Sequence, residues 1–258
     1  MKNTFPLALT FLTKAPWPFR GEAPAPVLAR AMFWFPWVGA LLGLAYFGVW
    51  WGLYQVLPDP AAAALLLIFT VYTTGALHLD GLADTADGLG GGRDPLDRLR
   101  IMKDSRLGTF GAASLVLVLL LKFTLFLEAP VLWTDLILFP VLSRWGMVML
   151  AFISPYARSE GGLGEAMTRG VGRRTVAGAT LSTLALALLL ARFRGLILLA
   201  GAAVLVWLGH LYFQKKLGGV TGDVLGAANE VLEALVLAGA LALTAYDLDP
   251  IPSLPPFW

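Results

Sequence analysis

Residues 107–128, LGTFGAASLVLVLLLKFTLFLE, form one of the apolar runs that decide the fold of this chain. About 20 helical residues cross a hydrocarbon core of about 30 Å, and this run is long enough to do so. Similar runs occupy 33–56, 61–79, 130–153, 175–191, 195–213 and 225–245. The runs are continuous rather than alternating with period two, which disfavours a β-barrel. We therefore expect a single all-α domain over 1–258, a polytopic integral membrane helical bundle of about seven transmembrane helices in a lipid bilayer.

The composition agrees with a membrane protein. The 258 residues are 58% hydrophobic and only 14% charged, with a mean hydropathy of +0.74, whereas soluble domains are about 45–50% apolar. The chain contains no Cys, which excludes disulfides, thiolate nucleophiles and thiolate metal ligands. Residues 1–30 begin with a charge and an apolar stretch, but Pro6 and Lys14 interrupt that stretch. We expect an uncleaved cytoplasmic N-terminal segment that lies in the membrane interface.

Basic residues are concentrated in alternate predicted loops. They occur before the first run, between the second and third, after the fourth and after the sixth. By the positive-inside rule these segments face the cytoplasm, including the loops 80–106 and 154–174, and the tail after Tyr246 faces outside. The sequence therefore predicts a multi-pass protein of the inner (cytoplasmic) membrane with its polar loops in the cytoplasm. Arg192 and Arg194 conflict with this scheme because they would face outside.

Residues 78–111, HLDGLADTADGLGGGRDPLDRLRIMKDSRLGTFG, contain six Asp and five Lys or Arg. At about 100° per helical residue, Asp84 lies about 40° from Asp80, and Asp87 lies about 20° to the other side. Three carboxylates on one face repel one another unless a cation lies among them. Oxygen ligands favour a hard divalent ion, and we expect Mg²⁺ as the cofactor. The sequence thus predicts a metal site at Asp80, Asp84 and Asp87.

Two cations follow this acidic face. Lys103 and Arg106 flank Asp104 and are suited to bind phosphate oxygens. A metal beside phosphate-binding cations predicts chemistry on a diphosphate. The intervening charges have the spacing of an ordinary surface helix with ion pairs along one face; they are Arg93, Asp94, Asp97, Arg98 and Arg100. The loop 154–174 either covers a charged substrate or serves only to set the topology.

Charged residues inside the apolar runs need partners. Arg144 lies about 14 Å from the end of its span, where an unpaired charge is costly. We expect it to pair with the Asp80–Asp87 face or with the face that carries Glu230 and Glu233, and direct substrate binding is the alternative. Asp223 and Glu230 are assigned to the metal set. Lys122 is near the outer end of its helix, so it can extend to the interface and is assigned no function.

His78 points about 160° away from Asp80 on the helical wheel. Structural packing explains His78 as well as a substrate contact does, and it is assigned to the substrate-binding set on the second interpretation.

Three separated motifs carry a resemblance to a known family. HLDGLADTADG at 78–88, IMKDSRLGTFG at 101–111 and GGVTGDVLGAANEVLE at 218–233 strongly resemble the cobalamin synthase family, also called adenosylcobinamide-GDP ribazoletransferase. FLTKAPWP at 11–18 resembles the family's Phe-Leu-Thr-x-x-Pro-x-Pro start. The motifs occur in the expected order without a departure inside them, and the likeness extends along nearly the whole chain.

The resemblance implies a membrane enzyme that uses Mg²⁺. Its substrates would be adenosylcobinamide-GDP and α-ribazole or its 5′-phosphate, and its products adenosylcobalamin or its 5′-phosphate and GMP. Lys103 and Arg106 would hold phosphate oxygens, and Asp104, or else Asp87, would accept the proton of the attacking hydroxyl. No nucleic acid partner is expected, and the sequence leaves open whether the chain oligomerises.

Three other classes of protein share parts of this pattern. A CDP-alcohol phosphotransferase performs the same kind of displacement, but the spacing of its Asp motif is absent. A UbiA-type prenyltransferase also combines Asp-rich loops with a magnesium diphosphate, but it would not need KDSRxGTFG. A cation-coupled transporter would more often place its acids at the middle of the membrane on broken helices.

Overall fold

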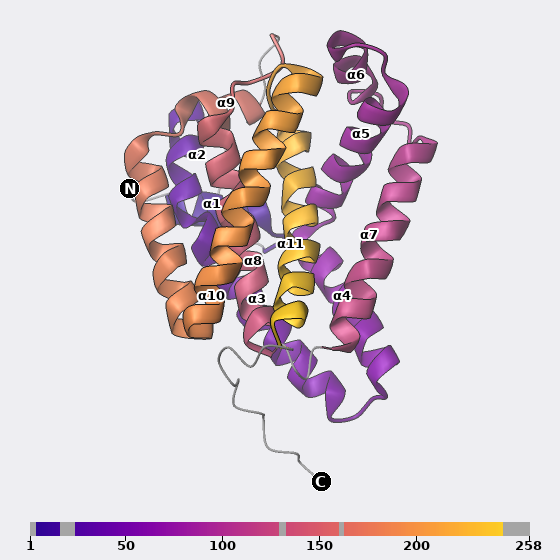
Figure 1. The fold of residues 1–258 in the computed structure, drawn as a ribbon, viewed down its shortest axis with the longest axis vertical. Coiled ribbons are helices and arrows are strands. Elements are labelled where there is room, and N and C mark those ends of the chain that lie inside the picture. The colour runs from indigo at the N-terminus through magenta and orange to yellow at the C-terminus, as the bar shows by residue number, and fades with distance from the viewer. Residues whose placement is uncertain (1–3, 16–23, 129–132, 160–162, 245–258) are drawn as a thin grey trace.

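The computed structural model describes residues 4–15, 24–128, 133–159 and 163–244, which form a bundle of helices (Figure 1). The helices are α1 Thr4–Leu12, α2 Ala25–Ala31, the 3-10 helix η1 Met32–Trp34, α3 Phe35–Tyr54, α4 Asp59–Thr74, α5 Leu77–Gly91, α6 Pro95–Ile101, α7 Thr109–Leu127, α8 Trp133–Ile153, α9 Leu163–Gly170, α10 Arg173–Leu217 and α11 Gly222–Thr244. Within these ranges the only extended pairing is one bridge between Tyr156 and Val220. The predicted all-α class is confirmed.

Several helices are long and apolar enough to cross a membrane. Among the described residues there are five, or up to six if α4 and α5 together form one bent span. The 45-residue α10 is itself two helices joined at Ala191 and Arg192, whose backbone is not helical. Its two arms lie side by side in Figure 1, and Gly195 closely approaches the backbone of Ala187. The chain therefore turns back where the sequence separated the runs 175–191 and 195–213.

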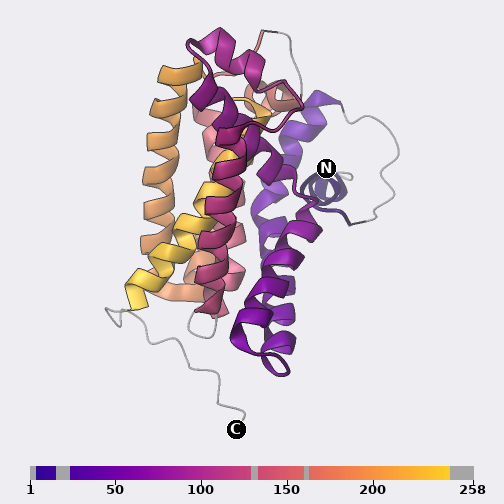
Figure 2. The ribbon, with the colours of Figure 1, turned by 90° about the vertical axis from the view of Figure 1, so that its right-hand side faces the viewer.

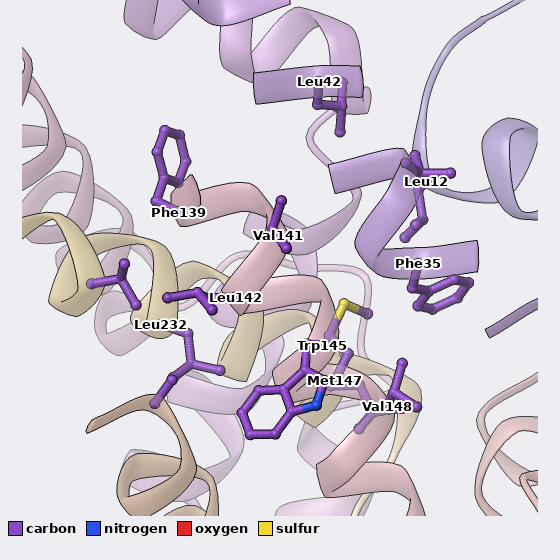
Figure 3. Packing of buried hydrophobic residues seen from close by; sticks show 14 of the residues in the cluster. Leu12, Phe35, Leu42, Phe139, Val141, Leu142, Trp145, Met147, Val148 and Leu232 are labelled. Carbon is purple, nitrogen blue, oxygen red and sulfur yellow. The ribbon is translucent and has the colours of Figure 1, made fainter. Parts of the chain in front are cut away.

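Helix α8 forms the centre of the core and packs against α3, α10 and α11 (Figure 3). It is buried on all sides near its middle, where Phe139, Leu142 and Val148 have no exposed surface. A Cβ at Gly39 or Gly43 of α3 would lie within 2.5 Å of the α8 backbone. Such small residues four apart let two membrane helices approach closely.

The predicted span 61–79 is not one continuous helix. Helix α4 ends at Gly75, where both Gly75 and Ala76 have left-handed backbone angles, with φ of 63° and 58°. Glycine tolerates this conformation, which commonly ends a helix. Helix α5 then starts at Leu77, and the axes of α4 and α5 differ by 89°. The break separates all three aspartates of the motif from the apolar run and places them on α5.

Glycines bring α5 and α11 together. A Cβ at Gly81 would lie 2.7 Å from the carbonyl oxygen of Asp223, and one at Gly226 would lie 3.3 Å from the Cα of His78. The two helices can therefore cross with their backbones almost in contact. This crossing carries the first and third sequence motifs to the same place.

The polar segments gather at one end of the bundle. In Figure 1 the end of α5, α6, α9 and the junction of α10 with α11 lie at the top, and the link from α3 to α4 lies at the bottom. Arg194 is at the opposite end from the polar segments, but it is buried and forms a 2.5 Å ion pair with Asp135. It is therefore an internal charge rather than a loop charge, and of the two arginines only Arg192 still conflicts with the positive-inside rule.

Helix α1 lies across the long axis of the bundle and is seen end-on in Figure 2. Its Leu7, Ala8 and Leu12 are buried, so this part of the predicted interfacial segment packs on the rest of the chain. The predicted external tail after Tyr246 lies outside the described residues, as do residues 16–23.

Candidate active site

A polar cavity of about 260 Å³ lies where α5, α8, α9 and α11 meet. Its wall contains five polar residues, His78, Asp80, Tyr156, Arg158 and Asp223. A larger hollow of about 390 Å³ between α5, α8, α10 and α11 is lined almost entirely by apolar side chains. Convergent polar groups mark a binding site more specifically than volume does, so the smaller cavity is the better candidate for charged substrates.

Two carboxylates line this cavity, and a third is on the next turn of α5. Asp80 and Asp223 lie in its wall, and Asp84 is close enough to feel the charges of both. Asp80 and Asp84 have no hydrogen-bond or ion-pair partner among the described residues. The sequence assigned Asp223 to the same metal set as the α5 carboxylates, and the glycine crossing of α5 and α11 brings Asp223 and Asp80 into the wall of one cavity.

Arg158 is the cation at this cavity, and the sequence did not single it out. Its Nη2 lies 2.7 Å from Oδ2 of Asp223. Two backbone hydrogen bonds fix the segment that carries it, because Ala157 donates to Val220 and Val220 donates to Pro155, both at 2.9 Å. Arg158 belongs to the basic loop used to assign orientation. Only the pairing of this loop with residues 219–223, which the sequence does not show, reveals its place.

Asp87 has a different environment from the other two aspartates of α5. Its carboxylate oxygens accept hydrogen bonds from the backbone N–H groups of Gly108 and Gly111, each at 2.7 Å. A Cβ at either glycine would lie 2.4 Å from an oxygen of Asp87. The anion thus caps the N-terminus of α7, where it is favoured by the free N–H groups and the helix dipole. This explains the glycine spacing in LGTFG, and it engages both oxygens of a predicted metal ligand.

Lys103, Asp104 and Arg106 lie at the same end of the bundle but not in the cavity wall. Asp104 is exposed and accepts three side-chain hydrogen bonds from Arg106, two from Nε at 3.0 and 3.2 Å and one from Nη2 at 2.7 Å. The Arg106 hydrogen bonds lower the pKa of Asp104 to about 2. A carboxylate with such a low pKa is a weak proton acceptor at neutral pH. This geometry disfavours Asp104, the first choice from sequence, as the general base.

The bundle interior contains a second set of charges, and Lys122 belongs to it. The prediction that Lys122 extends to the interface is wrong. Its side chain is buried and forms ion pairs with Glu230 and, at 2.6 Å, with Glu233. Arg144 is fully buried and pairs with Glu233, as expected for one of the two carboxylate faces. It does not line the polar cavity, so its placement does not support the alternative of a substrate contact.

Glu230 is not placed to share a metal ion with Asp223. Seven residues separate the two on α11, which corresponds to about 10 Å along the helix axis. The two α11 residues that the sequence assigned to one metal set therefore lie at different depths in the bundle. Asp223 serves the cavity, and Glu230 pairs with Lys122 in the interior.

His78 links the cavity to this interior network. Glu233 accepts a hydrogen bond from Nδ2 of Asn229 at 3.1 Å, which fixes the orientation of the amide because a carboxylate paired with Arg144 only accepts. The same Nδ2 lies 3.0 Å from Nδ1 of His78, so Nδ1 accepts and the proton of a neutral ring is on Nε2. Nε2 is buried without a partner among the described residues.

The donor set at the cavity fits a hard divalent cation, although it does not form a complete cage. Among the described residues, no three Asp, Glu or His side chains are close enough to hold a metal by themselves. Mg²⁺ is usually bound through one or two carboxylates together with substrate phosphates rather than in an all-protein site. The uncompensated Asp80 and Asp84 supply the oxygen ligands that such an ion prefers.

Comparisons with known proteins agree with the resemblance in the motifs. Residues 4–241 match the model of the family described as cobalamin-5-phosphate synthase. A protein of Syntrophobacter fumaroxidans named adenosylcobinamide-GDP ribazoletransferase is 43% identical over 249 residues, covering 94% of this chain and 100% of its own. Proteins of the same name from Geotalea daltonii and Pseudomonas putida GB-1 are 40% and 42% identical, covering 94% and 93% of this chain and 98% and 99% of their own. No solved structure matches the chain.

Proposed function

The chain belongs to the cobalamin-5-phosphate synthase family, and from this premise we propose that it is the transferase that completes the nucleotide loop of cobalamin. The relatives that match it over almost their whole length are named adenosylcobinamide-GDP ribazoletransferase. The observation in the structure that supports this activity is the cavity at which Asp80, Asp84 and Asp223 meet Arg158. A site rich in anions with one fixed cation suits a substrate that brings both a diphosphate and a divalent ion.

The reaction is a displacement at phosphorus. A ribose hydroxyl of α-ribazole attacks the phosphorus on the corrinoid side of adenosylcobinamide-GDP, the bond to the bridging oxygen breaks, and GMP leaves. The hydroxyl proton is taken up by a base. When α-ribazole 5′-phosphate is the acceptor, the same hydroxyl attacks, because the two products differ only in the phosphate on the 5′-oxygen. In that reaction the product carries the 5′-phosphate.

The residues of the cavity divide the work between them. We assign Asp80, Asp84 and Asp223 to a Mg²⁺ site, where the ion would neutralise charge on the diphosphate and the leaving GMP. We also assign the proton acceptor to one of these three carboxylates, because Asp104 is engaged by Arg106 and Asp87 by two backbone N–H groups. His78 lies in the cavity wall, where we assign it to substrate binding. Lys103 and Arg106 stand at the same end, where they attract the polyanionic substrate.

The test of the proposed function is the release of GMP by the purified protein. Adenosylcobinamide-GDP should yield GMP only when α-ribazole or its 5′-phosphate and Mg²⁺ are both present. A CDP-alcohol phosphotransferase or a UbiA-type enzyme would require a different diphosphate, and a transporter would release no GMP. Absence of GMP with all components present would refute the proposal.

The same proposal includes an orientation. The cavity faces the cytoplasm from the inner membrane, because Arg93, Arg98, Arg100, Arg158 and Lys215 belong to the segments at its end of the bundle (Figure 1). The chain has no Cys, so single Cys substitutions can report each end. Leu96, 81% exposed on α6, and Val56, 75% exposed in the link from α3 to α4, suit the experiment. Labelling of Leu96→Cys and Val56→Cys from the same side would refute this orientation.

A further inference from the structure

The charges of the polar cavity are unbalanced in a particular way. Asp80 and Asp84 have no cationic partner among the described residues, whereas Asp223 is paired with Arg158. Arg158 is the one Lys or Arg side chain in the described wall of the cavity. A divalent ion that enters would therefore meet two available carboxylates and a third whose oxygen is already taken by a guanidinium.

The pairing of Arg158 with Asp223 is built into the backbone. The bridge between Tyr156 and Val220 holds Arg158 beside the start of α11, and Gly164 lies against Gly222 so closely that a Cβ would be 2.6 Å from the Gly222 nitrogen. The Arg158 side chain is only 16% exposed. Its backbone is thus fixed at the cavity, and only the end of the side chain has freedom to change partners.

Arg158 also has hydrogen-bonding capacity that Asp223 does not use. A guanidinium has five N–H donors in a planar fork that matches phosphate geometry. Nη2 contacts Asp223, while Nε is buried without a partner among the described residues. A buried donor without a partner is costly, and a ligand oxygen can satisfy it.

We propose that Arg158 is a substrate-binding residue that exchanges partners, leaving Asp223 for the oxygens of the diphosphate when a divalent cation takes its place on Asp223. The inference rests on the proposed function for the identity of the diphosphate. In the free protein Arg158 neutralises Asp223 and keeps the α11 carboxylate in place. In the complex Asp223 would be free to help Asp80 and Asp84 hold the cation, and the guanidinium would contact oxygens of the diphosphate.

The exchange predicts opposite effects on two ligands, measured without turnover. Arg158→Gln removes the cation that competes for Asp223, so the protein should bind Mn²⁺ alone more tightly. The same variant should bind inorganic pyrophosphate, at saturating Mg²⁺, about tenfold to a hundredfold more weakly, because it lacks a charge-assisted hydrogen bond. Titration calorimetry or Mn²⁺ paramagnetic resonance on the full chain in detergent measures both affinities.

A matched control is available on α9. Arg169 pairs with Glu165 at 2.8 Å on the surface, so Arg169→Gln changes the net charge equally without touching the cavity. It should leave both affinities unchanged. The mirror variant Asp223→Asn should weaken Mn²⁺ binding and strengthen binding of pyrophosphate in the absence of metal, because it releases Arg158. This variant also serves if Arg158→Gln does not fold.

The directions in which the Mn²⁺ and pyrophosphate affinities change distinguish the exchange from the alternatives. If Arg158 has a purely structural role, Arg158→Gln should weaken the binding of both ligands. If Arg158 has no role at the cavity, neither affinity should change. Either result, or a change in only one affinity, overturns the exchange. Because these measurements use metal and pyrophosphate alone, they can fail while GMP release succeeds, and failure of GMP release leaves them interpretable.

Discussion

The acidic residues of this bundle occur in two contrasting surroundings. In the interior, Glu233 is held by both Lys122 and Arg144, so two buried anions and two buried cations cancel. At the polar cavity, Asp80 and Asp84 have no cationic partner among the described residues, although Asp223 adds a third negative charge beside them.

This contrast separates structural charges from functional ones. A charge inside a membrane bundle is costly unless it is paired, so an internal network that cancels needs no ligand to exist. A group of carboxylates left without enough cations stores repulsion that a bound cation relieves. Two carboxylates about three helical turns apart on α11 thus have different roles: Glu233 stabilises the bundle, and Asp223 is proposed to bind ligand.

The largest effect is expected for the unpaired carboxylates. Asp84→Asn should reduce GMP release more than about a thousandfold, an effect of several kcal/mol on the transition state, because it removes a carboxylate that we assign to the Mg²⁺ site. Its melting temperature should change little, because Asp84 has no partner to lose. Activity assays and thermal melting in detergent measure both.

Asp94→Asn is the matched control for this variant. Asp94 caps α6 by accepting a hydrogen bond from the N–H of Asp97 at 2.9 Å, and Asn caps helices equally well. It should be nearly silent in both assays. Similar activity of the two variants would show that Asp84 is no more important for GMP release than a surface carboxylate.

The second effect belongs to the interior network and should appear in stability. Arg144→Met leaves two buried carboxylates with Lys122 alone, at a cost of about 3–5 kcal/mol for breaking a buried pair. The double variant Arg144→Met with Glu233→Gln removes one charge of each sign and restores balance. It should therefore be less destabilised than the sum of the single variants, by about 1–3 kcal/mol.

Thermal melting of the four proteins in the cycle measures this coupling. Additive losses would mean that Arg144 and Glu233 do not act as a pair. The interior charges would then not be a stabilising network, as the contrast with the cavity requires.

The third effect is intermediate, because Asp87 lies on the same helix as Asp84 but caps α7. Asp87→Ala should destabilise the protein by about 1–2 kcal/mol, the usual cost of losing a helix cap near the dipole. Hydrogen exchange should show faster exchange of the Gly108 and Gly111 amides. In Asp84→Asn these amides should stay protected, and loss of protection there would mean that the aspartates of α5 act as one unit.

The sequence predicted much of this arrangement and missed parts of it for identifiable reasons. Helical periodicity was enough to place Asp80, Asp84 and Asp87 on one helix, and the cost of a buried charge was enough to give Arg144 a carboxylate partner. The sequence did not show that Lys122 faces inward, because distance from a helix end does not tell which neighbour a side chain meets.

Other failures concern contacts between distant segments. The break at Gly75 and Ala76 depends on two consecutive left-handed residues, and alanine gives no signal for that conformation. The pair of Arg158 and Asp223 depends on a bridge between segments more than 60 residues apart. The sequence shows glycine at 81 and at 226, but only the structure shows that these two glycines face each other.

The smallest effect is expected for Asp104, an exposed carboxylate paired with Arg106. Because the pKa of Asp104 is lowered to about 2, its contribution to stability is fully present above the unfolded pKa of about 3.9 and is lost as the pH falls through about 2. Between pH 5 and pH 8 the residue stays ionised, so Asp104→Asn should shift the melting temperature slightly and by the same amount at every pH. Asp97→Asn is the matched control, since hydrogen bonding to Arg100 also lowers the pKa of that exposed carboxylate. GMP release should keep its pH profile in both variants. A loss of more than about tenfold in Asp104→Asn alone would return Asp104 to the role of proton acceptor, and would mean that Arg106 leaves it when the diphosphate binds.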